Sequence, residues 1–154
     1  MFTALMVHTG ETLARCFDRK CFVDFQSFLH MLFGSLWCKK IRVLHLILDN
    51  GPTHAPKRIK KWIKSLDLPF RVKVHWLPIH ASWLDQVEIV FSHVQRYVLT
   101  PNDFQDTDEI EAVLMRHFKE RNRHPKPVRW TYTVEKLKAK FAQKDRQKKL
   151  ALAA

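Results

Sequence analysis

Apolar residues recur along this chain with two different spacings, which predict strands and helices in alternation. Short β-favourable runs over 2–7 and 12–17, separated by a polar turn, predict a hairpin. The runs 41–48 and 70–77 predict two further strands, the first rich in branched aliphatic residues and the second alternating apolar with polar positions. Apolar positions at three- and four-residue spacing predict helices over 22–37, 56–66, 82–99 and 107–121.

The order of these elements indicates an α/β fold. Strands that alternate with helices after an antiparallel start are typical of a mixed sheet flanked by helices. Beyond the last of these helices, 122–127 has the composition of a linker and 133–150 predicts a strongly basic helix. We therefore expect a core over residues 1–121 and a basic C-terminal extension over residues 122–154.

The composition is that of a folded protein. Hydrophobic residues make up 46% of the 154 positions and only three are Gly, which excludes a disordered or low-complexity chain. No apolar run approaches the roughly 18 residues that span a bilayer. The apolar start, residues 1–7, lacks the basic leader and the cleavage site of a signal peptide. We expect a cytoplasmic protein without a membrane partner.

The three cysteines and nine histidines show no spacing typical of a metal site or a disulfide framework. Cys16, Cys21 and Cys38 contain no C-x-x-C pair, so we expect reduced, buried thiols. The histidines contain no H-x-x-x-H pair, and we expect isolated structural or surface residues.

The net charge of +12 is distributed unevenly. Residues 1–115 carry 14 basic and 12 acidic side chains, whereas residues 116–154 carry 13 basic and 3 acidic ones. A second basic concentration lies within residues 39–73. Such surfaces favour polyanions, although lysine-rich helices are also common as merely solvated surfaces. The candidate DNA-binding residues are Lys57, Arg58, Lys60, Lys61, Lys64, Arg129, Lys136 and Lys140.

Three carboxylates are candidates for chemistry. Asp49 directly follows the run 41–48, at the carboxyl end of a predicted strand, where open α/β sheets usually bind ligands. Glu88 lies early in the helix after the next strand, and Asp85 shares its helix face. Converging carboxylates suit Mg²⁺ or Mn²⁺, and two such ions can promote phosphoryl displacement. The structural alternatives are a turn aspartate and ordinary residues of a helix N-terminus.

Three segments together resemble a known family: 46–54 (LILDNGPTH), 75–78 (HWLP) and 82–92 (SWLDQVEIVFS). They are similar to the catalytic core of mariner-like bacterial insertion-sequence transposases, which are D-D-E enzymes with a ribonuclease H-like fold. The resemblance extends from the hairpin to residues 129–132. It implies that Asp49 is the second catalytic aspartate and Glu88 the catalytic glutamate. It also implies Mg²⁺ or Mn²⁺ as cofactor and transposon-end DNA as partner, with a nucleoid location when DNA is bound.

The chain departs from the family pattern at two places. Asp85 stands where the family commonly has Asn. We expect this additional charge to perturb the metal site, to serve as a further metal ligand or to be harmless. The family's first aspartate lies on a strand before the hairpin, whereas here the hairpin starts at residue 1. The family's N-terminal helix-turn-helix region has no counterpart either. The resemblance therefore implies an N-terminally truncated core that lacks the first strand.

Two functions follow as expectations. The first is a transposase catalytic-core fragment for DNA transposition, by metal-dependent phosphodiester hydrolysis and strand transfer, that is inactive alone. The alternative is a noncatalytic DNA-binding module, or a protein that associates with a second copy of itself or with a full-length transposase.

Overall fold

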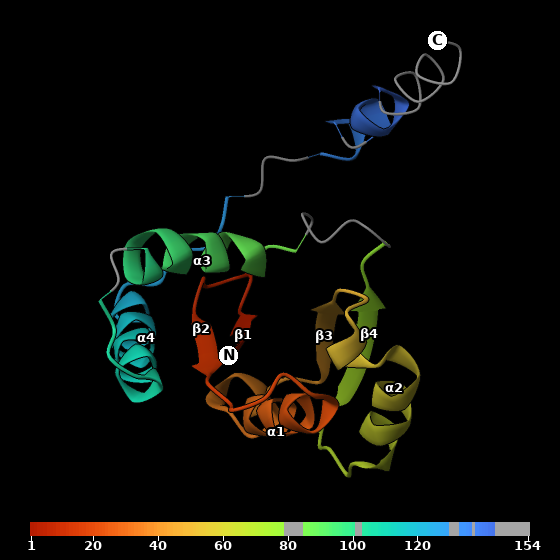
Figure 1. Cartoon of the computed structure of the whole chain (residues 1–154). Helices are drawn as coiled ribbons and strands as arrows, with labels where there is room; N and C mark the ends of the chain where they lie inside the picture. Colours follow the sequence, from red (N-terminus) through yellow and green to blue (C-terminus); the bar gives the residue numbers. More distant parts are fainter. Residues whose placement is uncertain (79–84, 101–102, 130–132, 137, 144–154) are drawn as a thin grey trace.

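The computed structural model describes residues 1–78, 85–100, 103–129, 133–136 and 138–143 of the chain (Figure 1). Its strands are β1 (Phe2–Leu5), β2 (Thr12–Arg15), β3 (Val43–Leu48) and β4 (Arg71–Trp76). Its longer helices are α1 (Phe22–Phe33), α2 (Pro56–Ser65), α3 (Val87–Val94) and α4 (Thr107–Arg121). Short helical turns are η1 (Leu36–Cys38), η2 (Pro52–His54) and η4 (Gln95–Leu99), the last of them π-helical.

The strands form two small sheets. β1 and β2 are antiparallel, as the predicted hairpin requires, and β3 and β4 are parallel, with Val43 opposite Arg71 and Leu48 opposite Trp76. The predicted α/β class is therefore confirmed, whereas the described strands form two separate two-stranded sheets and not one continuous sheet. β1 and β3 each pair along one edge only, so no ladder of hydrogen bonds joins the two sheets in the described part of the chain.

The main hydrophobic core lies between both sheets and α1. Phe25, Phe28 and Leu29 of α1 are buried, and they cluster with Phe2 of β1 and Leu48 of β3. α1 lies across the ends of both strand pairs in Figure 1. A single helix thus supports both sheets, although the sheets do not pair with each other.

A second core positions α3. Val90 and Val94 of α3 pack with Leu114 and Phe118 of α4, and Leu5 of β1 contacts this cluster. These helices therefore cover the hairpin on the side away from α1 (Figure 1). The β3–β4 pair receives no such cover from the described residues, and its outward positions, His45, Ile47, Arg71, Lys73 and His75, are exposed.

Most predicted helices form, with shifted ends. The helix over 107–121 is confirmed, and its N-cap Asp106 accepts a hydrogen bond from the backbone N–H of Glu109 at 2.8 Å. The helix predicted over 22–37 ends at Phe33 and continues as η1 after Gly34. α3 begins at Val87; the earlier predicted residues 82–84 lie outside the described residues.

The hairpin is fastened to the end of α4. Asn122 accepts hydrogen bonds from the backbone N–H and the hydroxyl of Thr12 at 2.9 and 3.1 Å and donates one to its carbonyl at 2.7 Å. Gly10 has a positive φ of 81°, and a Cβ there would lie 2.0 Å from the carbonyl oxygen of Lys126. Residues just beyond the predicted boundary at 121 therefore pack on the core, while the boundary itself stays a prediction.

Residues 134–136 and 138–143 are helical and exposed, and they extend away from the two sheets in Figure 1. This agrees with the predicted helix where the chain is described. Among the described residues no helix combines the length and apolarity that crossing a bilayer requires. The three cysteines are free, and Cys38 is buried.

Candidate active site

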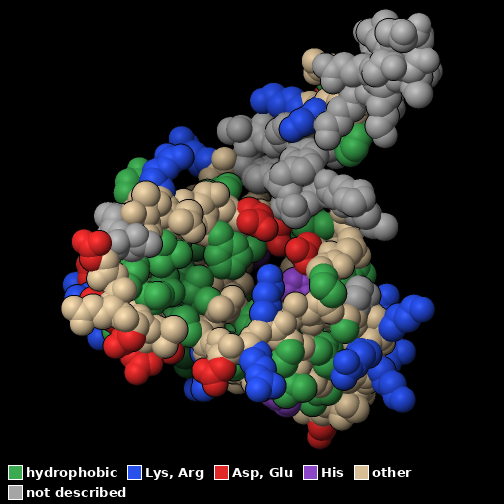
Figure 2. Space-filling model, in the orientation of Figure 1, with side chains coloured by type: hydrophobic (Ala, Val, Ile, Leu, Met, Phe, Trp, Pro, Cys, Tyr) green, Lys and Arg blue, Asp and Glu red, His purple; other side chains and the backbone are tan. Residues whose placement is uncertain are grey.

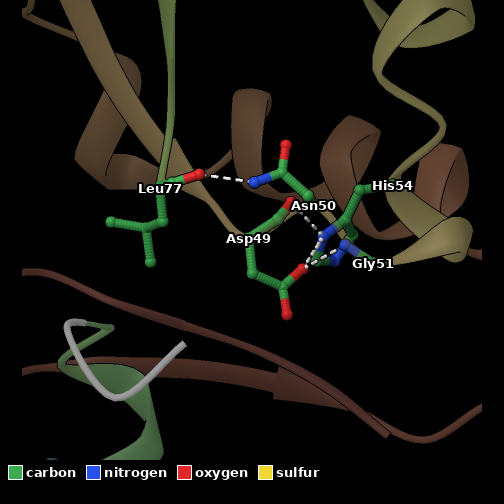
Figure 3. Close-up of polar contacts among 5 residues, drawn as sticks. All are labelled: Asp49, Asn50, Gly51, His54 and Leu77. Atoms are coloured by element: carbon green, nitrogen blue, oxygen red, sulfur yellow. Dashed lines mark hydrogen bonds and ion pairs between the residues drawn. The ribbon is translucent and has the colours of Figure 1, made fainter. Parts of the chain in front are cut away.

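Asp49 lies where β3 ends, as the sequence predicts. Its Oδ1 accepts a hydrogen bond from the backbone N–H of Gly51 at 2.9 Å, which forms a tight turn after the strand. A Cβ on Gly51 would lie 2.9 Å from the same oxygen, so the turn leaves little room for a side chain. The other oxygen, Oδ2, points away from the turn in Figure 3. One oxygen of Asp49 is thus anchored, while the second faces outward.

His54 is the second partner of Asp49. Its Nδ1 lies 2.7 Å from Asp49 Oδ1 and 3.2 Å from the backbone oxygen of Asp49 (Figure 3). η2 places His54 five residues after Asp49, and the imidazole packs on the ring of Phe25 with centroids 4.5 Å apart. The side chains of Asp49 and His54 are 36% and 20% exposed. The histidine therefore links the carboxylate to α1 and limits its rotation.

Asn50 ties the ends of the two parallel strands together. Its side-chain amide donates a hydrogen bond to the backbone carbonyl of Leu77 (Figure 3). Leu77 in turn donates from its backbone N–H to the carbonyl of Leu48 at 2.9 Å. This pair of bonds holds the residues after β4 beside the residues after β3, so the turn that carries Asp49 has a defined position.

Asp85 and Glu88 approach the turn from the start of α3. Asp85 Oδ1 accepts a weak hydrogen bond of 3.3 Å from the backbone N–H of Val87, while Glu88 lies in the first turn and is exposed. Figure 2 shows acidic side chains gathered where α3 approaches the ends of β3 and β4, beside a histidine. The structure thus brings Asp85 within electrostatic range of Asp49, although the two residues belong to distant segments of the chain.

The pKa of the Asp85 carboxyl is raised by its surroundings. Burial raises the pKa of its carboxyl above the ordinary value, and the charges of Glu88 and Asp49 raise it further. The Val87 hydrogen bond and His54 act in the opposite direction without cancelling the rise. Asp49 and Asp85 are therefore close enough to repel each other across the site.

The donor chemistry fits a hard divalent cation in part. Carboxylate oxygens are the ligands that Mg²⁺ prefers, and a positive charge would relieve the repulsion of Asp85 by Asp49 and Glu88. Among the residues described here, however, no three His, Cys, Asp or Glu side chains form a group arranged to hold a metal ion. Asp49 and Glu88 remain the candidate ligands, with Asp85 as a third.

The predicted basic residues of α2 form an exposed surface. Figure 2 shows Lys and Arg side chains gathered over this helix. Lys60, Lys61 and Lys64 line a groove of about 460 Å³ together with the apolar Val72 and Val74 of β4. Two further residues of the predicted set, Lys57 and Arg58, are exposed on the same helix, and the guanidinium of Arg58 lies over the ring of Phe22 at 4.3 Å.

The remaining predicted DNA-binding residues lie after α4. Arg129, Lys136 and Lys140 are exposed, the last two on the helical part of the extension. They are thus separated from the α2 surface in the chain and in Figure 1, and the structure does not bring the two basic groups together.

Three residues of this site had no role assigned to them from the sequence. Asn50, Gly51 and His54 belong to the segment that carries the family resemblance, but their separate contributions depend on the turn conformation. The available signal was the dense run of turn-forming residues after the strand, which indicated a turn without indicating its hydrogen bonds.

Comparison with known proteins identifies a family that covers most of the chain. The family model described as DDE superfamily endonuclease matches residues 1–111, which include β3, Asp49, Asp85 and Glu88. No match was found among curated proteins or among solved structures. Because the family model covers more than half of the sequence, the chain belongs to the DDE superfamily endonucleases.

Proposed function

We propose that this chain is a transposase catalytic core of the mariner-like bacterial insertion-sequence type. Membership in the DDE superfamily endonucleases indicates a transposase or nuclease function, with DNA as the substrate and a general dependence on divalent metal. Asp49 and Glu88 serve in the proposed core as catalytic carboxylates. The observation that carries the proposal is the electrostatic interaction of Asp85, just before α3, with Asp49 at the end of β3 and with Glu88 in the first turn of α3.

Each residue has a distinct part in the proposed reaction. Asp49 offers Oδ2 to the site while Gly51 and His54 hold its Oδ1, and Glu88 offers its carboxylate from α3. These two carboxylates would hold a divalent cation, which would supply the activation of water and the stabilisation of the leaving oxygen in phosphodiester hydrolysis. The freed 3′ hydroxyl then attacks a second phosphodiester in strand transfer. The α2 lysines hold the phosphate backbone of the DNA.

We further propose that the two sheets are the halves of one ribonuclease H-like sheet. Both halves pack on α1, and the unpaired edges of β1 and β3 belong to neighbouring strands in the view of Figure 1. In the family that the sequence resembles, the strand before the hairpin carries the first aspartate. A strand paired with both edges would complete the sheet and would bring that carboxylate toward Asp49.

This arrangement leads us to expect little or no DNA cleavage by the chain alone. Asp18 and Asp24 follow the hairpin, one before α1 and one in its first turn, so neither takes the place of the first aspartate. The carboxylate roles are therefore tested most directly by metal binding. We expect Mn²⁺ binding, followed by the relaxation rate of water protons, to weaken at least tenfold in Asp49→Asn and in Glu88→Gln.

The matched controls are Asp108→Asn and Glu111→Gln, which remove exposed carboxylates of α4. Equal Mn²⁺ binding by all four variants and the unaltered protein would contradict the proposed roles. Supercoiled plasmid incubated with Mg²⁺ should remain uncut. Nicking that Asp49→Asn abolishes would show that the chain is active alone, and would overturn the expected inactivity while supporting the site.

The basic groove beside α2 favours a second candidate function, a noncatalytic DNA-binding module or a partner of a full-length transposase. In that case DNA affinity depends on salt because lysine contacts release counterions from the phosphate backbone. Two results together would favour this candidate over the catalytic one. The protein would not bind Mn²⁺, and Asp49→Ala and Glu88→Ala would leave its DNA affinity unchanged.

A further inference from the structure

Two histidines meet on the open face of the β3–β4 pair. His45 of β3 and His75 of β4 are 30 residues apart in sequence, yet His45 Nδ1 lies 2.9 Å from His75 Nε2. In the parallel register His75 lies opposite Ile47, which is two residues after His45 and on the same face of the sheet. Both rings are exposed, so they form a surface pair and not a buried core contact.

The ring geometry is that of a hydrogen bond between imidazoles. The ring planes are 8° apart and the centroids are separated by 5.1 Å. At that centroid distance, with the two nitrogens in contact, the rings meet edge to edge and do not overlap as a stack. One ring donates an N–H and the other accepts with its lone pair, so the two nitrogens point at each other across the gap between the strands.

The spacing of the two nitrogens suits a transition-metal cation. Imidazole nitrogens bind such ions at about 2.0–2.1 Å, which places two adjacent nitrogens in the ligand shell about 3 Å apart. The 2.9 Å separation in this pair agrees with that spacing. To bind an ion, both rings must rotate away from the line between the nitrogens so that their lone pairs converge. The exposure of both rings allows this rotation, and it leaves room for water on the remaining positions.

We propose that His45 and His75 form a two-nitrogen chelate for a divalent transition-metal cation of the Cu²⁺ or Ni²⁺ class. These ions accept imidazole ligands in tetragonal geometry, and they bind nitrogen more tightly than the lighter divalent ions do. Mg²⁺ prefers oxygen ligands and does not compete here. The chelate is separate from the Asp49 carboxylate site and does not depend on the proposed transposase function.

Calorimetric titration with NiCl₂, in buffer containing excess MgCl₂, tests the proposal. We expect one Ni²⁺ bound per chain and at least a tenfold loss of affinity in both His45→Gln and His75→Gln. Because both side chains are exposed, these variants should keep the circular dichroism and melting temperature of the unaltered protein. Lys73 lies opposite His45 in the register, so Lys73→Gln should strengthen binding by removing a repelling charge.

Matched controls separate the chelate from other ligands. His8→Gln and His124→Gln remove exposed histidines elsewhere, and Asp49→Asn alters the carboxylate site; none should change the Ni²⁺ affinity. With CuCl₂, the electron paramagnetic resonance spectrum should show coupling to nitrogen that both chelate variants lose. Absence of saturable Ni²⁺ binding, or full affinity in His45→Gln and His75→Gln, would overturn the proposal.

Discussion

Single residues set the electrostatics of the carboxylate site. The Asp49 carboxylate is anchored by the backbone N–H of Gly51. Its charge acts on the partly buried Asp85, which belongs to a segment more than 30 residues later in the chain. Repulsion between them contributes to the raised pKa of Asp85, and a nearby positive charge would relieve it. His54 offsets part of this negative charge when protonated, and it also packs on Phe25.

The raised pKa of Asp85 predicts a pH-dependent effect of Asp85→Asn. Because the folded state holds the Asp85 proton more tightly than the unfolded chain does, the ionised carboxylate costs stability above its raised pKa. This cost disappears as the pH falls through that pKa to about pH 4, the ordinary range of Asp. In metal-free buffer, Asp85→Asn should therefore melt at a higher temperature than the unaltered protein at pH 7, with a smaller difference near pH 4.

The amide oxygen of Asn can still accept the hydrogen bond from Val87, so the helix start is preserved. Asp108→Asn, in the exposed first turn of α4, serves as the control and should not raise the melting temperature at pH 7. If Asp85→Asn lowers the melting temperature equally at both pH values, the raised pKa does not govern stability at this site.

At the scale of elements, α2 combines two surfaces. Its fully buried Ile59 anchors it in the main core, whereas its lysines face outward around the groove next to β4. The helix starts at Pro56 after Ala55, whose φ of 40° turns the chain sharply out of η2. This turn is what places a basic helix close to the Asp49 segment.

Replacing Lys60, Lys61 and Lys64 together by Gln should weaken DNA binding and reduce its dependence on salt. Each phosphate contact contributes about 0.9 to the slope of log affinity against log salt concentration, so the slope should become shallower by about 2–3. Fluorescence anisotropy with a labelled duplex at several salt concentrations measures this slope. Replacing the exposed Arg19, Lys20 and Lys119 by Gln should change this slope less. Equal changes of the slope in the two triple variants would argue against a specific α2 interface.

At the scale of the whole molecule, two sheets and two helical layers are joined by few contacts. α1 connects the sheets from one side, and the hydrogen bonds of Asn122 connect the hairpin to α4. Helix α3, which carries Glu88, is held by the hairpin side of this assembly. The position of Glu88 relative to Asp49 therefore depends on the packing of the whole molecule.

Asn122→Ala should lower the free energy of unfolding by about 2 kcal/mol, because three hydrogen bonds to Thr12 are lost and partly buried backbone groups are left unpaired. For a chain of this length the melting temperature should fall by roughly 4–8 °C. Gln105→Ala, at an exposed position before α4, should change the free energy by less than about 0.5 kcal/mol. Similar melting temperatures for both variants would show that Asn122 does not fasten the hairpin.

Local sequence patterns were sufficient to predict most of the secondary structure. The hairpin, the strand before Asp49 and the helix over 107–121 were all predictable, because period, turn residues and caps act within a few residues of one another. The helix ends were less accurate: Gly34 and the π-helical η4 reflect packing that the periodic pattern does not record.

The amino-acid sequence by itself determined the alternation of strands and helices, the position of Asp49 at a strand end and the two basic concentrations. Each of these depends on residues that are neighbours along the chain. Only the tertiary structure decided that the strands form two separate sheets, that Asp85 approaches Asp49, and that His45 meets His75. Those relations join segments 30 or more residues apart, and they depend on which strand edges pair and how helices pack, information that no local spacing contains.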